Sequence, residues 1–417
     1  MIAMSRHPSP TRLAILAWTI LSVFLLSLST GASISQAQEI GERMIVTVEN
    51  AEVLKDGEPF TEFPLGQHLY IEETAPNYYI FRDRGEVLWI RHNDVKTMQE
   101  AREFFTARIE KEATAADLVV RGDILYRLGY HDKALEDLEQ AEEIDDSIPD
   151  IYITRSAIFC EEDDYEVAQE EIELAAEFVP DHPTVLNIRG LIAYHYDDFD
   201  EAIEWYDKCL EANPSYSVAY SNRALVHIYL DDYDEAEADY ARSIEVAPAR
   251  STGHANFGWY LNSYKDDTAA AKEQFDKALQ LNPRDTTALY YRADIAFDEN
   301  DFETYVRDML IAVDAAPDEV EWKDNLAWHI ATTRDKKLRD AAKALEFAKE
   351  CVEESQWSDA DHICTLAVAY GGVKNYDKAL EILDRAEDED DYDSYTDRIE
   401  GLRDAFENQS QYYRSFD

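Results

Sequence analysis

The chain has 417 residues, of which 39 are Lys or Arg and 89 are Asp or Glu, so its formal net charge is −50. Such a field repels nucleic acid and anionic lipid headgroups and attracts cationic partners, which argues against a nucleic-acid-binding protein. The length exceeds what one compact core needs and predicts several domains or a long array.

The first 37 residues have the pattern of an export signal. Arg6 and Arg12 precede an apolar run over residues 13–28, and Ser35 and Ala37 offer the small side chains that a signal peptidase requires. The apolar run is shorter than the ~20 residues of a spanning helix, so cleavage is favoured over a permanent membrane anchor. We therefore expect an exported protein, periplasmic or associated with the cell envelope, with the uncleaved anchor as the alternative.

Residues 39–97 predict a small all-β module of roughly five short strands. Turn residues separate the predicted strands, which are the β-branched or aromatic runs at 44–48, 67–71, 78–81 and 87–90. The module resembles the bacterial Src-homology-3-like domain in its Leu65-Gly66-Gln67 approach, its Tyr78-Tyr79 pair, its Gly85 to Trp89 run and its Asn93 to Val95 turn. The resemblance implies a barrel that binds cell-wall peptide or protein through exposed aromatic residues.

The candidates for that ligand face are Tyr78, Tyr79 and Trp89. The alternative is that these rings fill the small core of the barrel. Residues 98–114 then carry Ala101, Phe105 and Ile109 at helical spacing, which predicts a helix that caps the following array and lets the barrel dock on it.

From residue 115 a 34-residue period predicts stacked helical hairpins. Alanines recur at that step (Ala134, Ala168, Ala202, Ala236), as do prolines (Pro180, Pro214, Pro248). The third repeat carries Leu186, Gly190, Ala202, Tyr206 and Pro214, and this pattern closely resembles the tetratricopeptide repeat (TPR) family. The resemblance implies a mainly α fold, a right-handed TPR solenoid of eight repeats over residues 115–386, beginning near Ala115, Pro149, Pro183, Ser217, Thr252, Thr286, Val320 and Ala360.

The run 326–340 resembles a variant found in exported bacterial TPR proteins, which often begin with the barrel module. Residues 387–417 predict a second capping helix and a tail after an acidic run, and Asp393 rules out a calcium loop because that position requires glycine. The four cysteines have no metal-ligand spacing, and a bridge between Cys351 and Cys364 stays open.

Four arginines on first helices have an acid 16 residues later, on the second helix of the same repeat. The pairs are Arg121 with Asp137, Arg155 with Glu171, Arg223 with Asp239, and Arg292 with Asp308. We expect partly buried ion pairs that fix helix register, with Arg189 stacked on Trp205 where the acid is missing.

The first helices of TPR arrays line a groove, and here they carry neutral and aromatic residues. The candidate partner groove comprises Asn187, Tyr194, His195, Tyr229, Trp259, Tyr290 and Phe297. Such a surface suits a protein or peptide partner with basic and apolar side chains, although each residue alone could serve packing.

No enzymatic motif is present, so the sequence predicts no catalytic residue, cofactor, metal or small-molecule substrate. The leading hypothesis is a non-enzymatic exported scaffold that binds its partners in the groove. The rival is a cell-wall-binding protein in which the barrel recognises the ligand and the repeats are a spacer.

Overall fold

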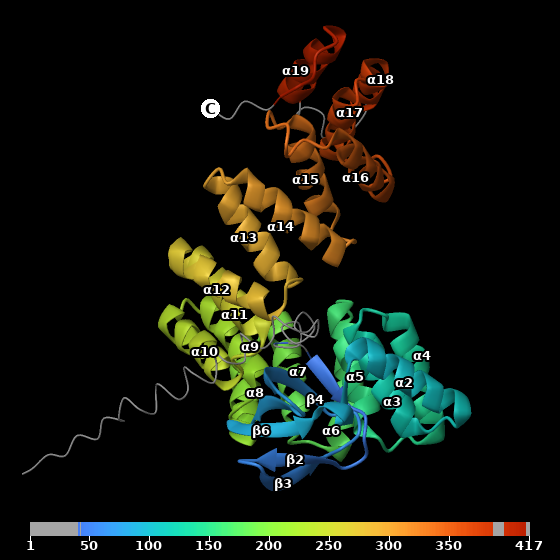
Figure 1. Cartoon of the computed structure of the whole chain (residues 1–417), viewed down its shortest axis with the longest axis vertical. Helices are drawn as coiled ribbons and strands as arrows, with labels where there is room; N and C mark the ends of the chain where they lie inside the picture. The colour runs from blue at the N-terminus through green and yellow to red at the C-terminus, as the bar shows by residue number, and fades with distance from the viewer. Residues whose placement is uncertain (1–40, 42, 387–395, 414–417) are drawn as a thin grey trace, which may run out of the picture. The chain divides into compact units, whose positions relative to one another are not determined.

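The computed structural model describes residues 41, 43–386 and 396–413 (Figure 1). The expected signal segment 1–37 and the acidic run 387–393 lie outside the described residues. The chain divides into two compact units, one up to Gly253 and one from His254 onward, and each is described by itself.

Seven antiparallel strands form a sheet in the order β3-β2-β6-β5-β4-β1-β7. The sequence predicted fewer strands because the β2–β3 hairpin, turning at Asp56 and Gly57, was not recognised as a strand pair. The core of the sheet contains Ile71, Phe81 and Ile90. The strands are β1 Arg43–Val46, β2 Ala51–Lys55, β3 Glu58–Phe63, β4 His68–Ala75, β5 Tyr78–Asp83, β6 Glu86–Arg91 and β7 Val95–Thr97, with a short 3-10 helix, η2 His92–Asp94, before β7.

Helix α2, Met98–Lys111, begins at a capping box formed by Thr97 and Glu100 and buries Ala101 and Phe105, as the spacing predicts. Helical hairpins follow. The first helices are α3 Ala115–Arg127, α5 Pro149–Glu161, α7 Pro183–His195, α9 Ser217–Tyr229, α11 Ser251–Tyr264, α13 Thr286–Asp298, α15 Val320–Thr332 and α17 Ala360–Gly372. The second helices are α4 His131–Ile144, α6 Tyr165–Phe178, α8 Phe199–Ala212, α10 Tyr233–Val246, α12 Thr268–Leu281, α14 Phe302–Ala315, α16 Ala341–Glu354 and α18 Tyr376–Ala386, and α19 is Thr396–Glu407.

The hairpins form for the reasons that the repeat pattern predicts, namely small residues where the helices cross and turn residues between them. Ala202 and Ala236 are fully buried where the two helices of a repeat cross. Gly190 lies so close to Tyr206 that an added Cβ would stand 2.5 Å from its ring. Between the helices, Asp197 has φ 60° and Asp231 has φ 61°, a conformation that Asp and Asn tolerate better than most residues. The mainly helical fold class is confirmed.

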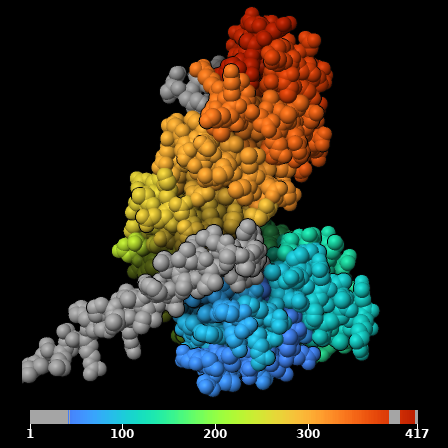
Figure 2. All heavy atoms as spheres, in the orientation of Figure 1, coloured from blue at the N-terminus to red at the C-terminus, as the bar shows by residue number. Residues whose placement is uncertain are grey.

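In the first unit the sheet packs on the first repeat. Ile45 and Leu65 share an apolar cluster with Phe105 and Ile124, and Gly66 lies against Val120 of α3. The His68 Nε2 atom lies 2.6 Å from an Asp123 carboxylate oxygen. Figure 2 shows the blue surface of the sheet next to the cyan surface of these helices. The module is therefore docked on the array.

Arg43 and Arg250 converge on Tyr70 at the same contact. The Arg43 Nε atom donates to the Tyr70 hydroxyl at 2.8 Å, and the Arg250 guanidinium lies 5.2 Å from the Tyr70 ring centre. Arg250 also donates to the hydroxyl of Ser217, the first residue of α9. The sheet thus contacts residues of the first and the fourth to fifth repeats.

In the second unit one core cluster runs from Ala293 to Phe406. Ile399, Leu402 and Phe406 of α19 are buried, as their helical spacing predicts. All four cysteines are buried and form no disulfide, so Cys351 and Cys364 are not bridged. None of the described helices has the length and apolar character needed to span a bilayer.

Candidate functional site

The four expected ion pairs are present within the repeats. Three are bidentate: Arg121 contacts Asp137 at 2.6 and 2.7 Å, Arg223 contacts Asp239 at 2.7 Å twice, and Arg292 contacts Asp308 at 2.7 and 3.0 Å. Arg155 contacts Glu171 at 3.0 Å. Asp308 is completely buried. These pairs join the two helices of a repeat, which is a structural role.

Three of these arginines also bond an acid of the preceding repeat, a link that the sequence analysis missed. Arg292 contacts Asp276 at 2.6 Å, Arg155 contacts Glu142 at 2.7 Å, and Arg223 contacts Asp207. For Arg223 and Arg292 the acid lies 16 residues before the arginine, so the same spacing read backwards could have found it. The arginines therefore tie neighbouring repeats together as well.

Arg189 stacks on Trp205 as expected, with its guanidinium 4.8 Å from the ring centre. It also bonds Glu173 of the preceding repeat at 2.6 and 3.0 Å, so the stacking adds to an ion pair rather than replacing one.

The groove residues of the first unit are mostly engaged with neighbouring repeats. Asn187 is buried and accepts a hydrogen bond from Asn222 at 3.2 Å. The His195 ring stacks on Tyr165 with centroids 3.5 Å apart, and Tyr194 lies edge-on to Tyr229 at 5.4 Å. Asn187 is thus packed between repeats. Tyr229, whose side chain is 58% exposed, stays available to a partner.

In the second unit Trp259 lies edge-on to Tyr264, with ring centres 5.5 Å apart, and it does not line a cavity with Tyr290 and Phe297. Tyr290 and Phe297, by contrast, line one cavity of about 170 Å³. Its other lining residues are Asp294 from α13, Tyr305 and Met309 from α14, and Asn325, Trp328 and His329 from α15. Two successive first helices and the second helix between them therefore form an aromatic recess.

The floor of this cavity is packed aromatic side chains. The Phe297 ring lies 5.1 Å from the ring of Tyr305 and 5.8 Å from that of His329, and Tyr305 and His329 are 4.9 Å apart. Tyr305 stands where the other repeats carry a small residue, which enlarges the aromatic surface here. Asp294 and Asn325 are exposed, so the polar groups lie toward solvent.

The cavity is locally acidic. Partial desolvation beside the aromatic lining raises the pKa of Asp294, although its side chain stays exposed, and the charge of nearby Asp298 raises it further. No ion pair within the described ranges involves Asp294. A recess of about 340 Å³ elsewhere in this unit is lined by Arg292, Asp276 and Asp308, but these charges already satisfy one another.

One register position explains why these side chains meet. Asp294 is the ninth residue of α13 and Trp328 is the ninth residue of α15. The ninth residues of the other first helices are Asp123, Ala157, Leu191, Leu225, Trp259 and Val368. Comparing this position across the repeats would have shown Trp328, which the sequence analysis missed.

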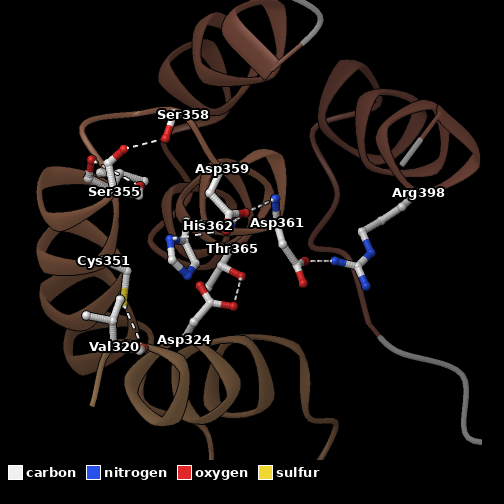
Figure 3. Close-up of polar contacts among 11 residues, drawn as sticks. Val320, Asp324, Cys351, Ser355, Ser358, Asp359, Asp361, His362, Thr365 and Arg398 are labelled. Atoms are coloured by element: carbon white, nitrogen blue, oxygen red, sulfur yellow. Dashed lines mark hydrogen bonds and ion pairs between the residues drawn. The ribbon is translucent and has the colours of Figure 1, made fainter. Parts of the chain in front are cut away.

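Asp324 is a buried carboxylate on the same helix as Trp328 (Figure 3). One of its oxygens accepts a hydrogen bond from Thr365 at 3.0 Å, and the other has no hydrogen-bond partner among the described residues. Burial raises the pKa of Asp324 to about 7, and the charge of Asp361 contributes. Asp361 itself is bonded to Arg398 of α19.

The proposed ligand face of the sheet needs a correction. Tyr79 is 6% exposed and belongs to the core of the sheet, because it points to the same side as Phe81. Tyr78 and Trp89 are half-buried, with ring centres 6.1 Å apart. Two of the three candidate residues therefore lie together outside the core. In the described ranges no group of acidic, Cys and His side chains is arranged to hold a metal ion.

Comparison with known families agrees with this geometry. Tetratricopeptide repeat models match residues 161–217 and 263–329, and a second such model matches 118–147 and 217–250. The chain therefore contains tetratricopeptide repeats, and its helical part is a TPR solenoid. No curated protein matches the sequence significantly.

Several solved structures of repeat proteins align with this chain at low sequence identity. The APC/C hetero-tetramer Cut9–Hcn1 aligns with a TM-score of 0.50 and 16% identity over 72% of this chain and 59% of that chain. YrrB, described as a TPR protein with an unusual peptide-binding site, has 21% identity and a TM-score of 0.29 over 45% of this chain and 97% of its own. The thermophilic TPR protein TTC0263 of Thermus thermophilus has 19% identity and a TM-score of 0.40 over 43% of this chain and 98% of its own.

Proposed function

We propose that this protein is a non-enzymatic scaffold that binds a protein or peptide partner on the first helices of its repeats. The observation that carries the proposal is the cavity between α13 and α15. A recess with an aromatic floor and a polar rim can take one side chain of a partner, and a pocketed anchor is how most interfaces gain their affinity.

The lining sets the chemistry of the partner. Phe297, Tyr305 and Trp328 offer apolar contact, whereas Asp294 is the only charged group in the lining. With a net charge of −50 the chain attracts positively charged partners. The partner is therefore basic and apolar.

We further propose that the protein is exported, on the basis of the pattern in residues 1–37. The mature chain recovered from cell envelopes should begin after Ala37. A chain in that fraction that keeps its original N-terminus would favour the uncleaved anchor, and one found in the cytoplasm would contradict export.

Site-specific photo-crosslinking tests the binding surface. A photoreactive residue at Asn325, on the cavity rim, should capture a partner in intact cells, whereas one at the exposed Lys277 of α12 should not. The charge reversal Asp294→Lys should reduce the capture at position 325 without changing the circular dichroism of the chain.

A photoreactive residue at Tyr78 addresses the rival function. Capture of cell-wall material from position 78 alone, with none from position 325, would overturn the scaffold proposal and favour recognition by the sheet.

A further inference from the structure

We propose that the cavity formed by α13, α14 and α15 binds an alkylammonium group, namely the end of a lysine side chain. The inference deepens the proposed function and rests on it, because the partner supplies that lysine. The argument uses an unpaired carboxylate, an equivalent carboxylate elsewhere in the chain, and the aromatic lining.

Asp294 is a carboxylate without a cation. It faces the cavity, and no Lys or Arg forms an ion pair with it within residues 43–386 or 396–413. The residue one helical turn further along α13 is Asp298, which adds a like charge to the same face. A cation entering the cavity would relieve this repulsion.

The first repeat shows what the chain does with a carboxylate at this register position. Asp123 is the ninth residue of α3, as Asp294 is of α13. Asp123 accepts hydrogen bonds from the Arg127 guanidinium at 2.9 and 3.0 Å and lies 2.6 Å from the imidazole of His68. Where the first repeat has Arg127, the sixth has Asp298. The chain thus supplies nitrogen donors at one site and leaves the equivalent site without a cation.

The cavity walls suit an ammonium on an apolar stem. Tyr290, Phe297 and Trp328 line the cavity with aromatic rings, a residue type that attracts cations, and Met309 adds an apolar contact. Trp328 already has the Arg398 guanidinium 4.6 Å from its ring centre, but Arg398 is bonded to Asp361. An ammonium is a compact point charge, whereas a guanidinium is a larger planar group that needs room for its whole fork, and the recess measures only about 170 Å³. On size, lysine therefore fits this recess better than arginine.

The full-length chain can be titrated with n-butylammonium chloride, which has the shape of a lysine side chain, and with neutral 1-butanol as its uncharged analogue of the same size. Binding is followed by saturation-transfer NMR at constant ionic strength. We expect n-butylammonium to bind and 1-butanol to bind at least about tenfold more weakly, which is the loss expected from one charge-assisted contact.

Two variants locate the site. Asp294→Asn should weaken n-butylammonium binding about tenfold. The matched control Asp298→Asn removes the same charge one turn away, outside the lining, and should change binding less than about threefold. Affinity should also rise as the pH is raised through the range in which Asp294 ionises, since only the carboxylate attracts the amine.

Three results would overturn the inference: equal binding of 1-butanol, unchanged affinity in Asp294→Asn, or tighter binding of n-butylguanidinium than of n-butylammonium. The free amine needs no partner protein, so its binding tests the cavity separately. Amine binding without crosslinking at Asn325 would refute the scaffold function alone, and crosslinking without amine binding would refute the lysine assignment alone.

Discussion

The first helices of repeats one and six, α3 and α13, have the same register and different surroundings. Arg121 and Arg292 are the seventh residues of these helices, and each bonds an aspartate on the second helix of its repeat. At the ninth position, Asp123 contacts the sheet through His68, whereas Asp294 faces a cavity. The same repeat pattern thus contacts the sheet in repeat one and leaves a recess in repeat six.

The comparison separates two kinds of position on the first helices, one that joins the helices of a repeat and one that varies from repeat to repeat. The arginine pairs lie between helices and are nearly the same in both repeats, so they define the scaffold. The ninth position varies in type from Asp to Leu to Trp.

The largest effect should follow from breaking the shared scaffold. Arg292→Ala removes the bidentate partner of the fully buried Asp308 carboxylate and leaves only its single contact with Arg307, which should lower the free energy of unfolding by about 3 kcal/mol. Urea denaturation of the full chain measures the change. The control Arg284→Ala removes an exposed pair with Asp314 and should cost less than about 1 kcal/mol. Equal losses of stability in the two variants would mean that the arginine pairs do not define the scaffold.

Asp324, a buried carboxylate that forms no ion pair among the described residues, should behave in the opposite way. The pKa of Asp324 in the folded chain is about 7, above its value in the unfolded chain, so its contribution to stability is present in acid and is lost as the pH rises through 7. Asp324→Asn should therefore stabilise the second unit by about 2 kcal/mol at pH 8 and change it little at pH 4.

Thermal unfolding at both pH values checks the behaviour of Asp324. The exposed Asp318→Asn serves as the control and should show no such dependence on pH. A loss of stability in Asp324→Asn at pH 8 would contradict the assignment.

Replacing Asp123, the carboxylate of repeat one that contacts the sheet, should have a smaller effect on stability. Burial alone would raise the pKa of Asp123, but Arg127 and His68 outweigh burial and hold that pKa well below its usual range. The contribution of Asp123 to the stability of the fold is therefore present above about pH 4 and is lost as the pH falls below that value. Asp123→Asn should cost about 1 kcal/mol at pH 7 and speed amide exchange in β4. The exposed Asp132→Asn should leave that exchange unchanged.

The smallest effect on stability is expected at the cavity. Asp294→Asn removes an exposed carboxylate that bonds nothing among the described residues, so the free energy of unfolding should change by less than about 0.5 kcal/mol. The same denaturation measurement applies. A loss comparable with that of Asp123→Asn would show that Asp294 belongs to the scaffold and would erase the distinction between the two repeats.

Much of the helical fold could be predicted because the repeat pattern is local. Seven of the eight first helices begin at the expected residue, and α11 begins one residue before Thr252. The ion pairs followed from a fixed spacing of 16 residues. The sheet was harder, since the β2–β3 hairpin has a largely exposed outer strand with little hydrophobic alternation. Of the groove candidates, only Tyr290 and Phe297 line the cavity, because exposure depends on which neighbouring side chains cover each ring.

The sequence by itself determined the hairpin repeat, its register and the arginine pairs, because helix periodicity and side-chain size act over short, regular separations. Only the tertiary structure decided that Asp123 meets His68 of the sheet while Asp294 faces a recess. Both are acids at the ninth position of a first helix, and the chain within one repeat does not show what packs against it. That outcome depends on contacts between segments far apart in sequence, such as β4 with α3, and on the bulk of Tyr305 and Trp328 around α13.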